Sequence, residues 1–195
     1  MEIGFQNLEG NFVRLEPLKF EHKEEIRTVV DSDPTAWSIL LVNPIGSGFE
    51  EYWKANCGAP TTERLPYAIR RLSDAQVVGA STYFTTKLKH GGVEIGATFL
   101  RPDARATFVN PEAKLLMLNH AFNSGAIRVQ FTVDVRNERS QAAVATLGAT
   151  KEGVLRRDTR TWTGHMRDTV VFSILDSEWP AVKLRLEKRL MRYRS

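Results

Sequence analysis

Residues 101–114, with the sequence RPDARATFVNPEAK, have the position and composition of an anion-binding loop. They follow an apolar strand-like run and precede a long helix-like run, and a helix that begins after a strand attracts anions through its free N–H groups. Arg101 and Arg105 would add positive charge, and Thr107 would add a hydroxyl donor. These features favour a phosphate-binding loop.

Other features of the same segment oppose phosphate binding. No glycine occurs between Gly96 and Gly125, although glycine normally lets a phosphate approach the backbone closely. Pro111 lacks an N–H group, and a carboxylate at Glu112 in the first helical turn competes with an anion. Asn110 is expected to cap the helix, with Pro111 at its first position. Three interpretations stay open: binding through altered contacts, weakened binding, or a capped connection that binds nothing.

A second pair of polar residues, Asn137 and Ser140, stands three residues apart at the start of NERSQAAVATLG and shares one helix face. Asn137 is expected to be the N-cap of that helix, and Gly148 fits its C-terminal end. The four histidines are scattered without the spacing of a metal site, so no metal is expected. The single cysteine, Cys57, cannot form an internal disulfide and fits a reducing interior.

The composition is that of an ordinary globular protein. The 195 residues are 42% hydrophobic, which predicts one core and one domain over residues 1–195. No secretory signal and no apolar run of membrane-spanning length occur, so we expect a cytoplasmic protein. The net charge of +4 comes from residues 183–195, which hold six basic residues and one glutamate. This pattern favours a solvated amphipathic helix over a nucleic-acid site.

The hydrophobic periodicity predicts seven strands and five helices in one mixed sheet. Helices are expected at 19–33, 49–57, 110–122, 137–148 and from about residue 177, and strands at 12–18, 66–72, 76–86, 92–100, 127–135, 149–157 and 167–176. A strand–helix–strand unit among antiparallel hairpins indicates an α/β (α+β) fold with a mostly antiparallel twisted sheet and helices on both faces.

A succession of motifs in the second half of the chain resembles one enzyme family. The motifs are VDVRNERSQAAVATLGATKEGVLR at 133–156, GHMRDTVVFSIL at 164–175 and EWP at 178–180, with VRLEPL at 13–18 and EIGATFL at 94–100 upstream. In this order and spacing they resemble the GCN5-related N-acetyltransferases (GNAT), in particular the branch of RimJ/RimL type. The resemblance implies an acyl-CoA N-acyltransferase fold that moves an acetyl group from acetyl-CoA to a primary amine.

The resemblance also implies where the coenzyme binds. Family members hold the pyrophosphate with an Arg/Gln-x-x-Gly-x-Gly/Ala loop. Here Arg105 matches its first residue, Phe108 stands at the first glycine, and Asn110 at the second small residue. Asn137 and Ser140 would lie beside the pantetheine arm and the sulfur. The implied coenzyme-binding residues are Phe99, Leu100, Arg101, Arg105, Ala106, Thr107, Phe108, Val109, Asn110, Asn137 and Ser140.

The catalytic roles that the resemblance implies fall on three residues. Glu94, in the EIG motif, is a candidate base that acts directly or through water; its alternative is an exposed strand carboxylate. Asp158 is a second and weaker candidate base. Ser140 would stabilise or protonate the thiolate, because no tyrosine occurs in 137–147. The oxyanion of the tetrahedral intermediate would meet a backbone N–H near Phe99.

The acceptor is less defined. The first helices and their loop line the acceptor pocket in this family, which implies that Trp37 and Tyr83 contact the amine. Protein N-termini and small amines both remain open, and so does a homodimer. Two alternatives to an acetyltransferase are kept: a protein that binds CoA but is catalytically weak, and an N-acyltransferase for a different acyl-CoA.

Overall fold

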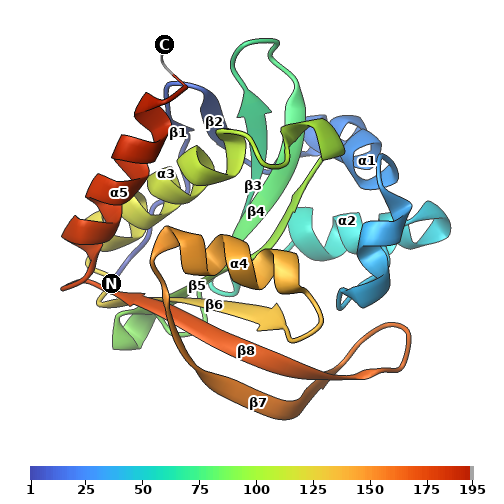
Figure 1. Cartoon of the computed structure of the whole chain (residues 1–195). Helices are drawn as coiled ribbons and strands as arrows, with labels where there is room; N and C mark the ends of the chain where they lie inside the picture. Colours follow the sequence, from blue (N-terminus) through green and yellow to red (C-terminus); the bar gives the residue numbers. More distant parts are fainter. Residues whose placement is uncertain (194–195) are drawn as a thin grey trace.

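The computed structural model describes residues 1–193 and contains one open sheet of eight strands in the order β1-β2-β3-β4-β5-β6-β8-β7 (Figure 1). Neighbouring strands pair antiparallel, except β5 and β6, which are parallel. This confirms the predicted mixed sheet. The strands are Leu8–Glu9 (β1), Val13–Pro17 (β2), Arg64–Arg71 (β3), Val77–Phe84 (β4), Gly92–Leu100 (β5), Arg128–Asp134 (β6), Thr150–Arg160 (β7) and Met166–Leu175 (β8).

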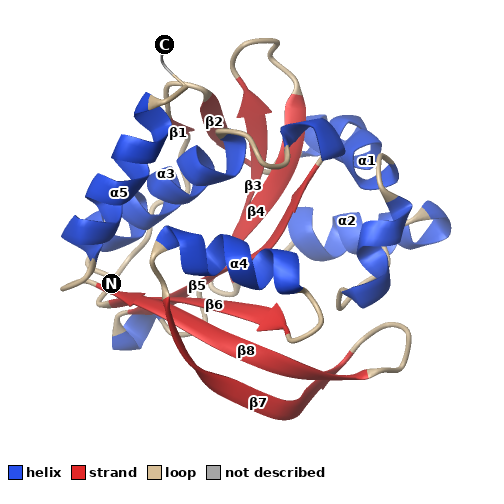
Figure 2. Cartoon of the chain, in the orientation of Figure 1, coloured by secondary structure: helices blue, strands red, loops and turns tan. Residues whose placement is uncertain are grey.

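Five α-helices cover both faces of the sheet (Figure 2). They are Lys23–Asp31 (α1), Phe49–Cys57 (α2), Val109–Asn123 (α3), Glu138–Leu147 (α4) and Trp179–Met191 (α5). Between α1 and α2 the chain forms a short 3-10 helix at Pro34–Ile39. In the described part of the chain, no helix combines the length and the apolar character needed to span a bilayer.

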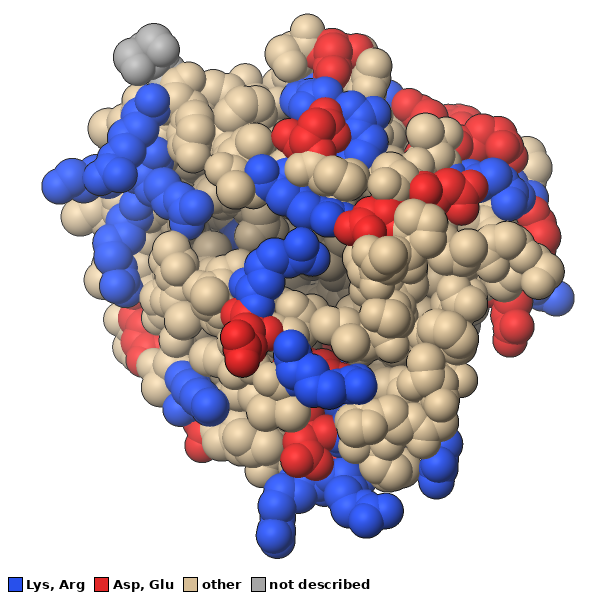
Figure 3. Space-filling model, turned by 45° about the vertical axis from the view of Figure 1, so that its right-hand side comes forward, with Lys and Arg blue, Asp and Glu red and all other residues tan. Residues whose placement is uncertain are grey.

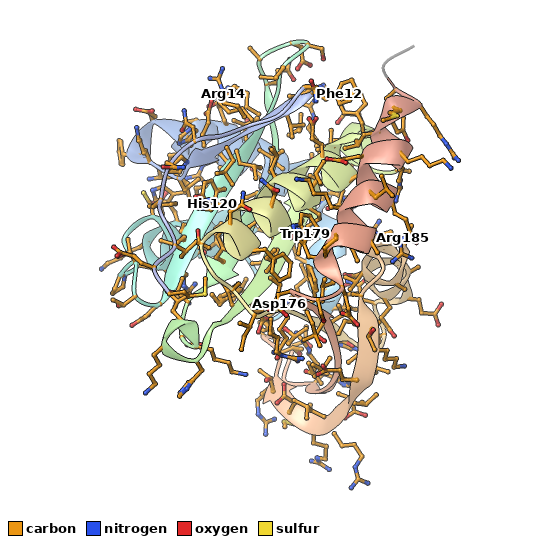
Figure 4. All side chains as sticks on the ribbon, turned by 90° about the vertical axis from the view of Figure 1, so that its left-hand side faces the viewer. Phe12, Arg14, His120, Asp176, Trp179 and Arg185 are labelled. Atoms are coloured by element: carbon orange, nitrogen blue, oxygen red, sulfur yellow. The ribbon has the colours of Figure 1, made fainter. Side chains whose placement is uncertain are left out.

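Two apolar clusters hold the helices to the sheet. On one face, α1 and α2 bury Ile26, Val30, Phe49 and Trp53 against β3 and β4. On the other face, α3, α4 and α5 contribute to a larger cluster that includes most of the inward-facing strand residues. Trp179 of α5, labelled in Figure 4, lies between α5 and α3 and stacks on Phe122 with ring centroids 5.3 Å apart. The sheet, including β5 and β6, therefore lies between a layer formed by α1 and α2 and a layer formed by α3, α4 and α5.

The predicted start of α3 is wrong by one residue, and its cap differs. The helix begins at Val109, after Phe108, because the Glu112 N–H donates to the Phe108 carbonyl at 3.0 Å. Thr107 Oγ1 accepts from the Val109 N–H at 3.2 Å and so takes the capping role expected of Asn110. Pro111 then stands at the third helical position, where an N–H has no intrahelical partner in any case.

Candidate active site

The sheet opens between β5 and β6. These strands pair only from Gly92 to Glu94 on β5 and from Arg128 to Gln130 on β6. Beyond this point β5 pairs only with β4, and β6 pairs only with β8. Residues 95–100 therefore face residues 131–134 across an opening without a strand ladder, and α3 and α4 both begin beyond it. We call this opening the splay; the face in Figure 3 is hollowed near its centre, with Lys and Arg side chains around the hollow.

The arginines of the loop before α3 are engaged in ion pairs. Arg105 Nη1 lies 2.6 Å from Asp33 Oδ2, and its Nε donates to the Leu100 carbonyl at 2.9 Å. Arg101 Nε lies 2.7 Å from Asp103 Oδ1, and this pairing holds the pKa of the Asp103 carboxyl well below its usual range. The positive charge that the sequence placed here is thus largely neutralised within the protein.

The loop before α3 contains a residue with positive φ, although it has no glycine. Ala106 adopts a left-handed conformation with φ +58°, which is the role expected of a glycine. Phe108, in contrast, has φ −67°, so the position aligned with the first family glycine requires no special conformation. Its ring lies 4.8 Å from that of Phe12 and packs against the main core. The Thr107 hydroxyl donates to the Ala104 carbonyl at 2.8 Å, so this donor is used inside the loop.

Glu112 does not compete for an anion at the start of α3, contrary to the expectation from the sequence. Its carboxylate is buried and accepts from the N–H groups of Asn11, Phe12 and Val13 at 2.7–2.8 Å. It therefore ties α3 to the turn before β2 and points away from the splay. In the first turn of α3 the Val109 N–H donates to Thr107 and the Glu112 N–H donates to Phe108, and Pro111 has no N–H. Asn110 is therefore the residue of this turn whose N–H has no partner within residues 1–193 and is open to a ligand.

The first turn of α4 confirms the predicted cap and leaves a hydroxyl free. Asn137 is the N-cap, and its side-chain oxygen accepts from the Ser140 N–H at 3.1 Å. The Ser140 side chain is half-buried, and its hydroxyl makes no hydrogen bond within residues 1–193. Because α4 begins just after β6, this hydroxyl lies near the wide end of the splay and has a donor to offer.

Glu94 stands at the narrow end of the splay. Val93 and Ile95 on either side are buried in the core under α3, so Glu94 points to the opposite face, toward α1 and α2. Its carboxylate accepts from Thr132 Oγ1 at 2.6 Å and from Gln130 Nε2 at 3.3 Å, both on β6. The alternative of a freely exposed strand carboxylate is therefore wrong: Glu94 is half-buried and bridges the two strands where they part.

A buried arginine lies close enough to both candidate bases to feel their charges, and the sequence did not mark it as a site residue. Arg167 on β8 is buried, and its Nε has no hydrogen-bond partner in the described part of the chain. Burial lowers the pKa of Arg167, while the charges of Asp134, Asp158 and Glu94 oppose this. Asp158 accepts from Thr169 Oγ1 at 2.8 Å on the same face of the sheet. Glu94 and Asp158 thus both interact electrostatically with the Arg167 guanidinium.

The two expected acceptor contacts differ in their placement. Trp37 is buried, donates from Nε1 to the Val30 carbonyl at 3.2 Å and packs edge-on against Phe99 at 5.0 Å. It therefore lies next to β5 on the face of Glu94. Tyr83 has no exposed surface and donates its hydroxyl to the Met117 carbonyl at 2.5 Å, in the core on the opposite face. The prediction that Tyr83 contacts the acceptor is therefore wrong, because the Tyr83 side chain points from β4 to the face that α3 covers.

Another polar group beside the splay is Lys114 on α3, a residue that the family motifs of the sequence do not include. Its side chain is buried, and Nζ donates to Thr98 Oγ1 at 2.7 Å and to Ser81 Oγ at 2.9 Å. Burial lowers the pKa of Lys114 to about 7. Its spacing of three and four residues from the apolar Met117 and Leu118 was the signal that it faces inward.

The arrangement suits a reaction at a carbonyl held in the splay. Two helix N-termini face its wide end, where an anion gains from the backbone dipoles. A carboxylate stands at its narrow end and a free hydroxyl at its rim, which are groups that can accept and donate a proton. Residues 1–193 contain no group of three or more His, Cys, Asp or Glu side chains that could hold a metal ion.

Comparisons with known proteins agree with this geometry. The profile of the Acetyltransferase (GNAT) domain matches residues 13–150. A Thermus (T. thermophilus) protein provisionally named an acetyltransferase is 39% identical, with a TM-score of 0.86, over 97% of this chain and 100% of that chain. A GCN5-related N-acetyltransferase from Brucella melitensis is 26% identical, with a TM-score of 0.88, over 95% of this chain and 85% of that chain.

A more distant likeness is to Mycobacterium smegmatis RimJ, whose structure was determined in complex with CoA-disulfide. It is 21% identical, with a TM-score of 0.79, over 96% of this chain and 93% of that chain, which shows a common fold. No curated protein matches the sequence. Because the GNAT domain profile matches residues 13–150 and the sheet is open and mixed, the chain belongs to the GNAT acetyltransferase family and is an acyltransferase.

Proposed function

We propose that the protein is an acetyl-CoA-dependent N-acetyltransferase of the RimJ/RimL branch that acts on a primary amine. The observation that carries this proposal is the splay, with two helix N-termini at its wide end and the half-buried Glu94 at its narrow end. The motif succession over residues 133–180 supports the branch.

In this mechanism the pantetheine arm runs along residues 95–100 of β5, and the pyrophosphate lies against the backbone N–H groups of residues 106–108 and of Asn110, which have no partner within residues 1–193. The contacts come mainly from the backbone of Phe99 to Asn110, because Arg101 and Arg105 are held by Asp103 and Asp33. Asn137 would bind the arm from the other side of the splay.

The chemical step joins the groups at the two ends of the splay. Glu94 takes a proton from the acceptor ammonium, directly or through water, and the neutral amine attacks the thioester carbonyl. A backbone N–H near Phe99 stabilises the oxyanion. The C–S bond then breaks, and the nitrogen loses its extra proton, which passes through the Ser140 hydroxyl to the departing thiolate; Ser140 gives one proton and receives one. Asp158, whose charge acts on the buried Arg167, stays a second candidate base.

Release of CoA thiol from acetyl-CoA over a panel of primary amines and short peptides tests this proposal. Glu94→Gln and Ser140→Ala should each lower kcat by about 10²-fold or more, while acetyl-CoA binding measured by calorimetry changes little. Thr150→Ala, a polar change on the exposed strand β7, serves as a control that leaves turnover unchanged. Full activity in Glu94→Gln would refute its role as base.

One observation favours a second candidate, a CoA-binding protein with weak catalysis: the loop arginines are already paired within the protein. Thermal-shift measurements with CoA, acetyl-CoA and longer acyl-CoAs separate the cases. Stabilisation without thiol release from any amine would favour the weak catalyst, preference for a longer acyl-CoA would favour a different donor, and no stabilisation by any of them would refute all three.

A further inference from the structure

Lys114 forms a closed triangle of hydrogen-bonding groups with two hydroxyls. Nζ lies 2.7 Å from Thr98 Oγ1 and 2.9 Å from Ser81 Oγ, and the two hydroxyl oxygens lie 2.8 Å from each other. The three residues come from α3, β5 and β4, respectively. The triangle therefore joins the helix that opens the coenzyme loop to the two strands beside the splay.

The triangle stands on a β-bulge. The register of β4 and β5 shifts between Ala80 and Thr82, so Ser81 lies opposite both Ala97 and Thr98. Ala97 has φ +46°, a left-handed conformation that is unfavourable for alanine and persists only where its surroundings hold it. The hydroxyls on both sides of the bulge are the two groups that Lys114 binds.

The bulge changes which side chains face α3. Val93 and Ile95 pack under α3, and regular alternation would send residue 97 there next. The extra residue places Thr98 on that side instead and directs Phe99 toward Trp37 on the opposite face. The backbone groups of residues 97–99 are thereby re-aimed in the segment of β5 that has lost β6 as a partner.

Proton counting distinguishes the two forms of Lys114. A neutral amine has two N–H groups, one for each hydroxyl, and the Thr98 hydroxyl in turn lies 3.4 Å from the Gly96 carbonyl, to which it donates. An ammonium has three N–H groups, of which the two hydroxyls accept only two. The pKa of about 7 arises from burial alone, with no contribution from a charged group. The nearest titratable groups face elsewhere: Glu112 toward β2, and the Tyr83 hydroxyl toward Met117.

From this geometry we propose that Lys114 is a positioning residue for acyl transfer: through Thr98 and Ser81 it fixes the β5 bulge whose backbone N–H groups receive the carbonyl oxygen of the acyl donor. The inference rests on the proposed function, because it places the thioester against residues 97–99. Lys114 does not touch the reacting atoms. Its neutral form matches the two hydroxyl acceptors, and its protonation adds a third N–H that has no acceptor in the triangle and so weakens the hold on the bulge.

The test uses the carbonyl carbon of [1-¹³C]acetyl-CoA bound to the full chain. In the wild type, hydrogen bonds from the bulge shift the carbonyl resonance downfield of that of free acetyl-CoA. Thr98→Val removes the hydroxyl but keeps the branched shape, and Lys114→Met removes the amine but keeps the length. Each should move the resonance back toward the free value, whereas Thr98→Ser restores the hydroxyl and the wild-type resonance.

Kinetics give the second readout. Loss of the triangle should lower kcat by about 10- to 100-fold, the scale expected for a misplacement of about 1 Å, while KM for acetyl-CoA stays within about twofold. The wild type should also lose kcat below an apparent pKa near 7, and Lys114→Met should lack this inflection. A purely structural lysine would change stability without this split between kcat and KM.

The outcomes separate the inference from the proposed function. If Thr98→Val and Lys114→Met bind acetyl-CoA with wild-type carbonyl resonance and wild-type kcat, the positioning role is overturned. Thr98→Val, on a half-open strand edge, keeps this test valid even if Lys114→Met fails to fold. If the wild type neither binds acetyl-CoA nor shifts its resonance, the proposed function itself fails, and this inference fails with it.

Discussion

The buried Lys114 should make the stability of the fold depend on pH in a way that one substitution removes. In the folded protein the pKa of Lys114 is about 7, whereas an unperturbed lysine has a pKa of 10.5. Above pH 10.5 the amine is neutral in both states. Between pH 10.5 and 7 the unfolded chain binds a proton that the folded chain does not, so the free energy of unfolding falls as the pH falls.

The magnitude follows from these two pKa values. Each pH unit over which only the unfolded chain is protonated changes the free energy of unfolding by about 1.4 kcal/mol. Between pH 7 and pH 9 the folded amine passes from half-protonated to neutral. Over this interval the titration of Lys114 raises the free energy of unfolding by about 2 kcal/mol. This contribution exceeds the effect of most single surface charges.

Urea unfolding of the wild type and of Lys114→Met at pH 7, 8 and 9 measures this contribution. The difference in free energy of unfolding, wild type minus variant, should rise by about 2 kcal/mol from pH 7 to pH 9, because other titrating groups cancel. Lys183→Met on α5, a half-buried lysine bonded to Asn119 at 3.1 Å, is the matched control. A difference that is flat with pH for Lys114→Met would refute the buried neutral amine.

Three further predictions concern the coenzyme loop and α4. Phe108→Ala should cost about 2 kcal/mol of stability without tightening acetyl-CoA binding, because the ring packs against the core; tighter binding in calorimetry would mean that the ring obstructs the anion. Asp33→Asn should free Arg105 and tighten acetyl-CoA binding by about fivefold at low salt, whereas Asp31→Asn, with the same change of charge, should leave the affinity unchanged. Asn137→Ala should cost about 1 kcal/mol in urea unfolding through loss of the cap, and an unchanged stability would contradict the role of that cap.

The arrangement of elements could be predicted from the sequence because it depends on periodicity and local signals. Alternation in residues 127–135 and the cap signals at Asn137 and Gly148 define β6 and α4, and both are present. The parallel pairing of β5 and β6 follows from the helix between them. These features rest on residues close together in the chain.

The hydrogen-bond and ion-pair partners of the side chains in the site could not be predicted in the same way. The engagement of Arg105 depends on Asp33, 72 residues away, and Glu112 is bound by backbone groups about 100 residues away. No local pattern shows such partners. The left-handed residue of the loop also escaped prediction, because Ala106 lies two positions before the residue aligned with the family glycine, and alanine gives no sign of positive φ.

The glycine-free loop and the buried lysine have a common physical explanation. A phosphate loop rich in glycine is flexible and gains its order when the ligand binds. Here Phe108 packs against Phe12, Glu112 fixes α3 to the start of β2, and Lys114 fixes the same helix to β5. These three side chains thus order the beginning of α3 before any ligand arrives. A preordered site loses less conformational entropy on binding, so its affinity can rest on backbone N–H groups rather than on free arginines.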